Sequence, residues 1–168
     1  DEVVMAMKQW TRLCDRSIVE RGQQDPSLLQ MGTTLTGLLA FNNTLFVLNI
    51  GDSRIYRLRY DIFKQLTEDH SERQRTGDQS VPSNLIYNAL GTGTAFIDVK
   101  VMQLVEDDRY VAQTCSMRNR CCVSFLFCKV NKFLLQTSNK YLVLKRFSSF
   151  YFCLFCLAFH EVEFAVEG

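Results

Sequence analysis

Near the start of the chain, hydrophobic residues recur every three or four positions. Across residues 2–21 this spacing places one apolar stripe along a helix, formed by Val3, Met7, Trp10, Cys14 and Ile18. Gly22 follows the stripe and is predicted to end the helix, because glycine commonly stands just past a helix C-terminus. The chain therefore opens with a helix whose apolar face needs a partner.

The pattern then becomes strand-like. Apolar runs at residues 35–41 and 45–50 flank Asn42-Asn43, a pair that tolerates the left-handed conformation of a hairpin turn. Shorter apolar runs follow at residues 55–58 and 63–67. We therefore predict an antiparallel meander within one sheet, with Gly51 to Arg54 forming a tight turn between its second and third strands.

The next part of the chain predicts shorter elements. Ser71 and Gln74 have the spacing of a capping box, which indicates that a helix begins there. Glu106, Asp107 and Asp108 read as a charged turn. The other predicted elements are a loop over residues 76–84, a short helix over 85–90 that ends at Gly91, a half-buried strand over 96–104 and a last strand from Tyr110.

Composition divides the chain near Ala112. Residues 1–112 carry a net charge of −3 and residues 113–168 carry +4. The second part holds six of the seven cysteines and nine of the thirteen phenylalanines, and neither glycine nor proline occurs between Gly93 and Gly168. Compact domains use those two residue types to turn the chain. We predict a domain over residues 1–112 and an unrelated tail over residues 113–168, such as read-through or out-of-frame sequence would give.

Whole-chain properties exclude some classes of partner. The net charge of +1 generates no field that would attract nucleic acid or a membrane surface. The apolar run at residues 149–159 is shorter than the roughly 20 residues that a membrane helix needs, and the first residues lack the pattern of a signal peptide. We expect an intracellular, cytoplasmic monomer that binds neither nucleic acid nor membrane.

Four short motifs occur in order in the first part of the chain. They are Met31-Gly32-Thr33-Thr34, Gly51-Asp52-Ser53-Arg54, Thr67-Glu68-Asp69-His70 and Asn88-Ala89-Leu90-Gly91. Each motif alone is weak, but together they resemble the metal-dependent serine/threonine protein phosphatases, the PPM-type or type-2C-like family. The match covers roughly residues 31–110.

This resemblance implies a fold and a reaction. The family fold is α+β, a four-layer sandwich of two antiparallel β-sheets flanked by helices, and this chain would hold a fragment of it. The family hydrolyses phosphoserine and phosphothreonine esters in phosphoprotein substrates. It uses two Mn²⁺ or Mg²⁺ ions, which activate a bridging water and neutralise charge on the phosphoryl oxygens.

The same resemblance implies a site around the second motif. Asp52 would lie beside the metal ions and help to bind a third, weaker ion through water. Thr34, Gly51, Ser53 and Arg54 would lie near this centre. Two plainer interpretations stay open: Asp52 could cap a turn, and Arg54 is expected to form a structural ion pair rather than bind phosphate.

His70 also allows two roles. It could serve as a general acid or base, or it could be a structural side chain close to a helix start. The family performs its chemistry with metal-bound water. We therefore expect the structural role.

Most of the family's metal ligands have no counterpart here. No Asp-Gly-x-Gly-Gly motif occurs in the 168 residues, Ser116 or Met117 stands where the family has an aspartate, and no aspartate follows Asp108. One carboxylate binds a hard divalent ion weakly. We therefore assign no catalytic residue, expect Mn²⁺ or Mg²⁺ not to be held tightly, and expect this partial phosphatase domain to be inactive.

Three functional hypotheses follow. The chain is an incomplete phosphatase domain, a non-catalytic phosphatase-like binding module, or a fragment without a function of its own. The abrupt change in composition favours the first and third hypotheses over the second. The sequence does not specify the substrate.

Overall fold

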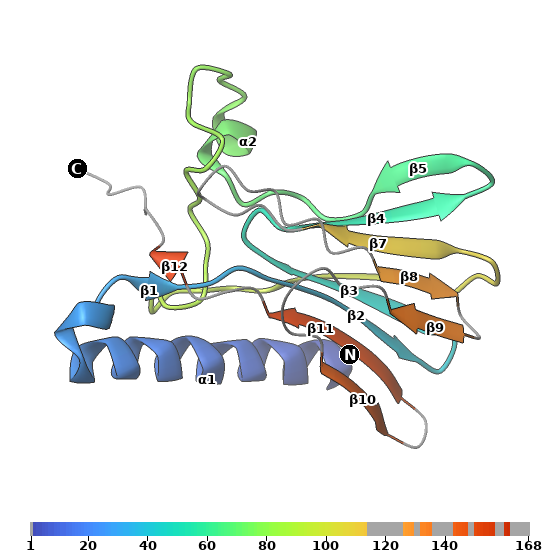
Figure 1. Ribbon diagram of the computed structural model, residues 1–168, viewed down its shortest axis with the longest axis horizontal. Helices are drawn as coiled ribbons and strands as arrows, with labels where there is room; N and C mark the ends of the chain where they lie inside the picture. The colour runs from blue at the N-terminus through green and yellow to red at the C-terminus, as the bar shows by residue number, and fades with distance from the viewer. Residues whose placement is uncertain are drawn as a thin grey trace.

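The computed structural model describes residues 2–113 and, beyond them, the backbone of five short strands (Figure 1). The first part contains α1 (Glu2–Gln24), the 3₁₀ turn η1 (Pro26–Leu28), β1 (Met31–Gly32), β2 (Leu35–Phe41), β3 (Thr44–Ile50), β4 (Arg54–Arg59), β5 (Ile62–Gln65), α2 (Glu72–Thr76), β6 (Asp98–Gln103) and β7 (Arg109–Gln113). The later strands are β8 (Leu126–Lys129), β9 (Lys132–Leu135), β10 (Val143–Phe147), β11 (Phe150–Cys156) and β12 (His160–Glu161).

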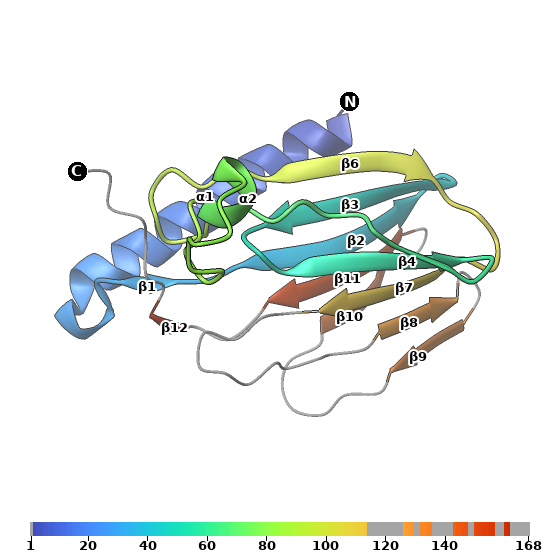
Figure 2. The same cartoon turned by 90° about the horizontal axis from the view of Figure 1, so that it is seen from above.

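Two antiparallel sheets and one long helix form successive layers (Figure 1). The larger sheet has the strand order β10-β11-β2-β3-β6, and the smaller has the order β5-β4-β7. Helix α1 runs along the outer face of the larger sheet, as both views show (Figures 1 and 2). The fold is therefore mixed α+β, and no helix among the described residues is long and apolar enough to span a membrane.

Strands β2 and β3 are apolar on both faces because each face of the larger sheet is covered. Leu35 and Leu39 pack in the cluster that α1 covers. Leu38, Leu45 and Val47 alternate with such residues and face the smaller sheet. Continuous hydrophobic runs are typical of strands buried in this way.

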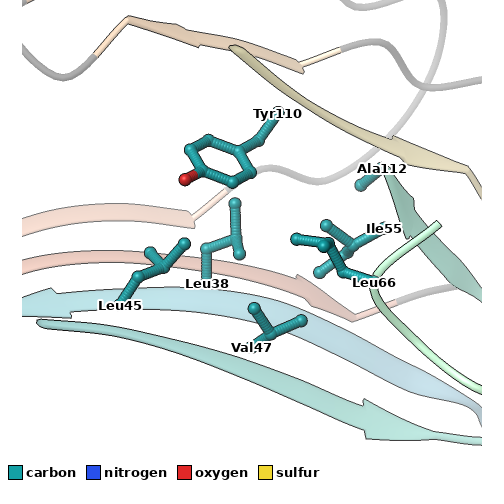
Figure 3. Close-up of a cluster of buried hydrophobic side chains, with 7 residues drawn as sticks. All are labelled: Leu38, Leu45, Val47, Ile55, Leu66, Tyr110 and Ala112. Atoms are coloured by element: carbon teal, nitrogen blue, oxygen red, sulfur yellow. The ribbon is translucent and has the colours of Figure 1, made fainter. Parts of the chain in front are cut away.

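The core between the sheets is drawn in Figure 3. It brings together three residues of the larger sheet with side chains of the smaller sheet and one from the segment after it: Leu38, Leu45, Val47, Ile55, Leu66, Tyr110 and Ala112 (Figure 3). Ile55 is fully buried and Tyr110 is 1% exposed. This cluster fixes how β4 and β7 lie over β2 and β3.

The apolar stripe predicted for the first helix is confirmed, because all five of its residues pack against the larger sheet. The predicted end at Gly22 is wrong, since α1 continues to Gln24. Gly22 is buried, and a Cβ atom there would lie 2.8 Å from the Leu28 carbonyl oxygen. This glycine therefore permits close approach of η1 rather than ending the helix.

The predicted hairpin turn at Asn42-Asn43 is confirmed, but the single meander is wrong. Asn42 and Asn43 have φ values of 47° and 59° between the paired strands β2 and β3. Strand β3 does not pair with β4: β3 belongs to the larger sheet and β4 to the smaller. The residues between Ile50 and Arg54 therefore carry the chain from one sheet to the other, and we call this segment the crossing.

The short helix predicted over residues 85–90 is also wrong. Its backbone forms isolated bridges instead, with Ser71 opposite Ile86 and Thr33 opposite Leu90. These long-range hydrogen bonds satisfy backbone groups that a helix would have used. The predicted start of a helix at Ser71 is confirmed, since the Ser71 hydroxyl accepts a hydrogen bond of 3.3 Å from the Gln74 N–H at the start of α2.

The predicted tail includes strands of the described backbone. Strand β11 pairs with β2 from Tyr151 opposite Ala40 to Cys156 opposite Leu35. The side chains of residues 114–168 lie outside the described residues, as do Ser116 and Met117. The boundary near Ala112 and the unrelated origin of residues 113–168 stay predictions.

Candidate site at the crossing between the sheets

The crossing is built around a glycine that no other residue can easily replace. Gly51 has a φ of 97°, and a Cβ atom there would lie 2.4 Å from Cγ2 of Thr34. The Thr34 and Ser53 hydroxyl oxygens lie 2.8 Å apart in a hydrogen bond. Thr34, Gly51 and Ser53, which the sequence placed near one centre, are thus in contact.

Asp52 is half-buried at this crossing. Burial raises the pKa of its carboxyl above the ordinary value, and the negative charge of Asp69 adds to this effect. A hydrogen bond with its own backbone and the charge of Arg54 offset part of the rise. No basic side chain among the described residues forms a hydrogen bond or ion pair with Asp52. The carboxylate is therefore desolvated without being neutralised.

Arg54 is held by Asp69. Its Nε donates to both carboxylate oxygens at 2.9 Å, and its Nη2 forms a further close contact with Oδ2. This hydrogen bonding raises the pKa of the Arg54 guanidinium, with desolvation opposing it. Gln65 also donates to Asp69, at 3.1 Å. The expected structural ion pair of Arg54 is confirmed, and Asp69 is already occupied by these donors.

Hydrogen bonds of the His70 side chain connect the crossing to Asn88 and Asp98. The Gly51 N–H donates to Nδ1 at 3.0 Å, and the Asn88 side-chain amide lies 2.7 Å from the same atom. Because Nδ1 accepts, the ring proton belongs on Nε2, which lies 2.9 Å from a carboxylate oxygen of Asp98. The His70 backbone N–H also donates to the Gly51 carbonyl at 3.0 Å. With both ring nitrogens in hydrogen bonds and the side chain buried, His70 has the structural role that we expected.

Two further polar residues hold the surrounding loops, and the sequence interpretation did not assign them this role. Asn88 pairs with the backbone of Phe96, accepting from its N–H at 3.1 Å and donating to its carbonyl at 2.9 Å. Asp15 of α1 accepts from the N–H groups of Gly91, Gly93 and Ala95 at 2.6, 3.3 and 3.1 Å. The signal that could have found Asp15 is an acidic residue directly beside the apolar stripe of α1.

A second carboxylate lies buried at the other end of β4. Arg59 donates to both oxygens of Asp108 at 2.6 and 2.7 Å, and the Tyr110 hydroxyl donates at 2.8 Å. Burial opposes ionisation, but these hydrogen bonds outweigh it and lower the pKa of Asp108 below its ordinary value. Asp108 is therefore an internal anchor that directly follows the charged turn, which the structure has at Glu106 and Asp107.

The residues at the crossing do not form a site for two divalent ions. Hard cations of this kind need several oxygen ligands, mostly carboxylates. Among the residues that the structure describes, no group of three or more His, Cys, Asp or Glu side chains could hold a metal ion. Asp69 is bound to Arg54, so Asp52 is left as a single carboxylate.

Part of this chain resembles known proteins. Residues 3–76 match the family model of protein phosphatase 2C. The serine/threonine phosphatase stp of Listeria innocua is 31% identical over 119 residues, which cover 64% of this chain and 47% of that protein. The chain thus spans about half the length of the curated relatives it matches.

Solved structures of serine/threonine phosphatases also resemble part of this chain. The catalytic domain of the serine/threonine protein phosphatase PstP, determined in complex with two manganese ions, is 29% identical with a TM-score of 0.58, and the match covers 66% of this chain and 50% of that one. The serine/threonine phosphatase of S. agalactiae is 28% identical with a TM-score of 0.61, covering 67% and 51%.

Proposed function

Because this chain contains part of a protein phosphatase 2C domain, we propose that it comes from a protein that hydrolyses phosphoserine and phosphothreonine esters. The chain supplies the crossing that bears Asp52, and the complete parent domain is a four-layer sandwich with helices on both outer faces. Phosphoproteins are the substrates of that parent.

One observation carries this proposal. Asp52 is a half-buried carboxylate whose pKa is raised by burial, and no basic side chain of the described residues pairs with it. A cation placed beside such a group is stabilised by its charge. We therefore assign Asp52 to a position beside the Mn²⁺ or Mg²⁺ ions of the complete domain, with Thr34 and Ser53 shaping the crossing.

The chain by itself is proposed to be inactive. Two-metal hydrolysis requires both ions, since together they supply the activated water and the charge that stabilises the transition state. The described residues offer one free carboxylate at the crossing. No catalytic residue is assigned.

The test is a phosphatase assay of the purified 168-residue chain on p-nitrophenyl phosphate with millimolar Mn²⁺, beside an Asp52→Ala variant. We expect no Mn²⁺-dependent hydrolysis by either protein. Hydrolysis that requires Mn²⁺ and disappears in the variant would overturn the proposal that the chain is inactive. A longer protein from the same gene, containing the missing part of the domain, should be active and lose most of its activity in Asp52→Ala.

The alternative is a phosphatase-like module that binds a partner without hydrolysis. The shortage of carboxylates at the crossing supports it as well. The two functions separate when the longer protein is mixed with a phosphoserine peptide, because a binding module leaves the phosphate in place. In both cases we propose an intracellular, cytoplasmic monomer without nucleic-acid or membrane binding, which size-exclusion chromatography with light scattering and cell fractionation would check.

A further inference from the structure

An open groove of about 840 Å³ lies between α1 and the loop at residues 93–97. Thr11 and Asp15, both buried, contribute to its lining. Val19, Ala95 and Phe96 add apolar surface, and Phe96 is 47% exposed. The volume lies in the range typical of ligand sites. None of Thr34, Gly51, Asp52 and Ser53 lines this groove.

Positive side chains outnumber negative ones in the lining of the groove. The carboxylate of Asp15 is satisfied by three backbone N–H groups, and Glu20 pairs with Arg16 at 2.7 Å. Lys8 and Arg12 also line the groove, are exposed, and form no ion pair with any described residue. Residues four positions apart lie on the same side of a helix, so these two cations are neighbours.

We infer that this groove binds an acidic, extended peptide segment of a partner protein. Carboxylates of such a segment would pair with Lys8 and Arg12. An apolar side chain that lies between these carboxylates in the peptide would pack on Phe96. Two free cations are too few for the row of phosphate contacts that nucleic-acid binding usually needs. The inference does not depend on the proposed phosphatase function, because the groove shares no lining residue with the crossing.

Fluorescence anisotropy of the full 168-residue chain tests this inference. The probe is a fluorescein-labelled seven-residue peptide with four glutamates around a central leucine. We expect saturable binding that weakens as salt rises from about 50 to 300 mM. The double variant Lys8→Glu/Arg12→Glu should weaken binding by about tenfold or more. Thr94→Trp, which fills the groove without changing its charge, should weaken binding as well.

The matched control is Arg21→Glu/Lys64→Glu, which makes the same change in net charge at exposed residues outside the groove. It should leave the affinity within about twofold. Equal losses in the control and the groove variant, no saturable binding, or tighter binding of a ten-nucleotide uridylate than of the peptide would each overturn the inference. Melting curves by circular dichroism establish that each variant is folded.

Discussion

Two carboxylates that lie near opposite ends of β4 differ in whether a basic side chain pairs with them. At one end, Asp108 is fully buried and accepts hydrogen bonds from Arg59 and Tyr110, which lower its pKa. At the other end, Asp52 is half-buried, has no basic partner among the described residues, and has a raised pKa.

The contrast shows what decides whether a buried carboxylate stabilises the folded chain. A buried charge is tolerated when it is paired, and removing its partner is costly. Asp108 meets that condition, since Arg59 of β4 forms an ion pair with it. Asp52 does not, because the arginine beside it is used by Asp69. Asp52 is thus the carboxylate that forms no ion pair with the described residues.

The largest expected effect comes from breaking the internal anchor. Asp108→Ala removes the acceptor of Arg59 and of the Tyr110 hydroxyl, so the free energy of unfolding should fall by about 3 kcal/mol. Urea denaturation followed by circular dichroism measures the change. Glu106→Ala, an exposed acidic residue two positions away, should change stability by about 0.5 kcal/mol or less. Equal effects in the two variants would contradict the assigned role of Asp108.

The next largest effect should come from His70→Ala. The change leaves the Gly51 N–H and the Asn88 amide without their acceptor, which should reduce stability by about 2 kcal/mol. In NMR spectra the Gly51 amide should shift strongly. Asp98→Asn keeps an oxygen acceptor for Nε2 and should change stability by about 0.5 kcal/mol or less. A loss in Asp98→Asn as large as that in His70→Ala would show that the charge of Asp98, rather than the presence of an oxygen acceptor, stabilises this contact.

The two carboxylates should also give opposite pH dependences. Because the folded pKa of Asp108 is lowered, its stabilisation is fully present above the ordinary aspartate pKa of about 3.9 and is lost as the pH falls toward its lower folded pKa. Because the folded pKa of Asp52 is raised, protonation favours the folded state as the pH falls through that raised value. Comparing Asp108→Asn and Asp52→Asn with the unchanged chain between pH 3 and 7 separates the two slopes. Slopes of the same sign would contradict the comparison.

The smallest expected effect is an increase in stability, caused by Asp52→Asn. At pH 7, Asp52→Asn removes a desolvated charge near Asp69 while keeping the size of the side chain, so stability should rise by about 1 kcal/mol or less. Thermal melting in the presence of a chelator measures it. Glu106→Gln removes an exposed charge and should leave the melting midpoint nearly unchanged. A clear loss of stability in Asp52→Asn would show that the carboxylate has a partner that stabilises it.

Features set by neighbouring residues could be predicted from the sequence. The turn at Asn42-Asn43 requires positive φ angles that asparagine tolerates, and the start of α2 depends on Ser71 and Gln74 three positions apart. The apolar stripe of α1 follows from helical spacing alone. The order of four motifs was enough to indicate the phosphatase family. The role that the motifs imply for Asp52 stays a prediction.

Features set by distant residues were decided by the tertiary structure. A turn within one sheet and a crossing between two sheets look alike in sequence, and only the packing of β4 on β7 shows which one Gly51 forms. Residues 85–90 do not form the predicted helix, because their backbone forms bridges with Thr33 and Ser71 instead. Asp108 is an anchor because Arg59, 49 residues away, reaches it. Local spacing determines which conformations are available, and long-range hydrogen bonds and burial determine which one is stable.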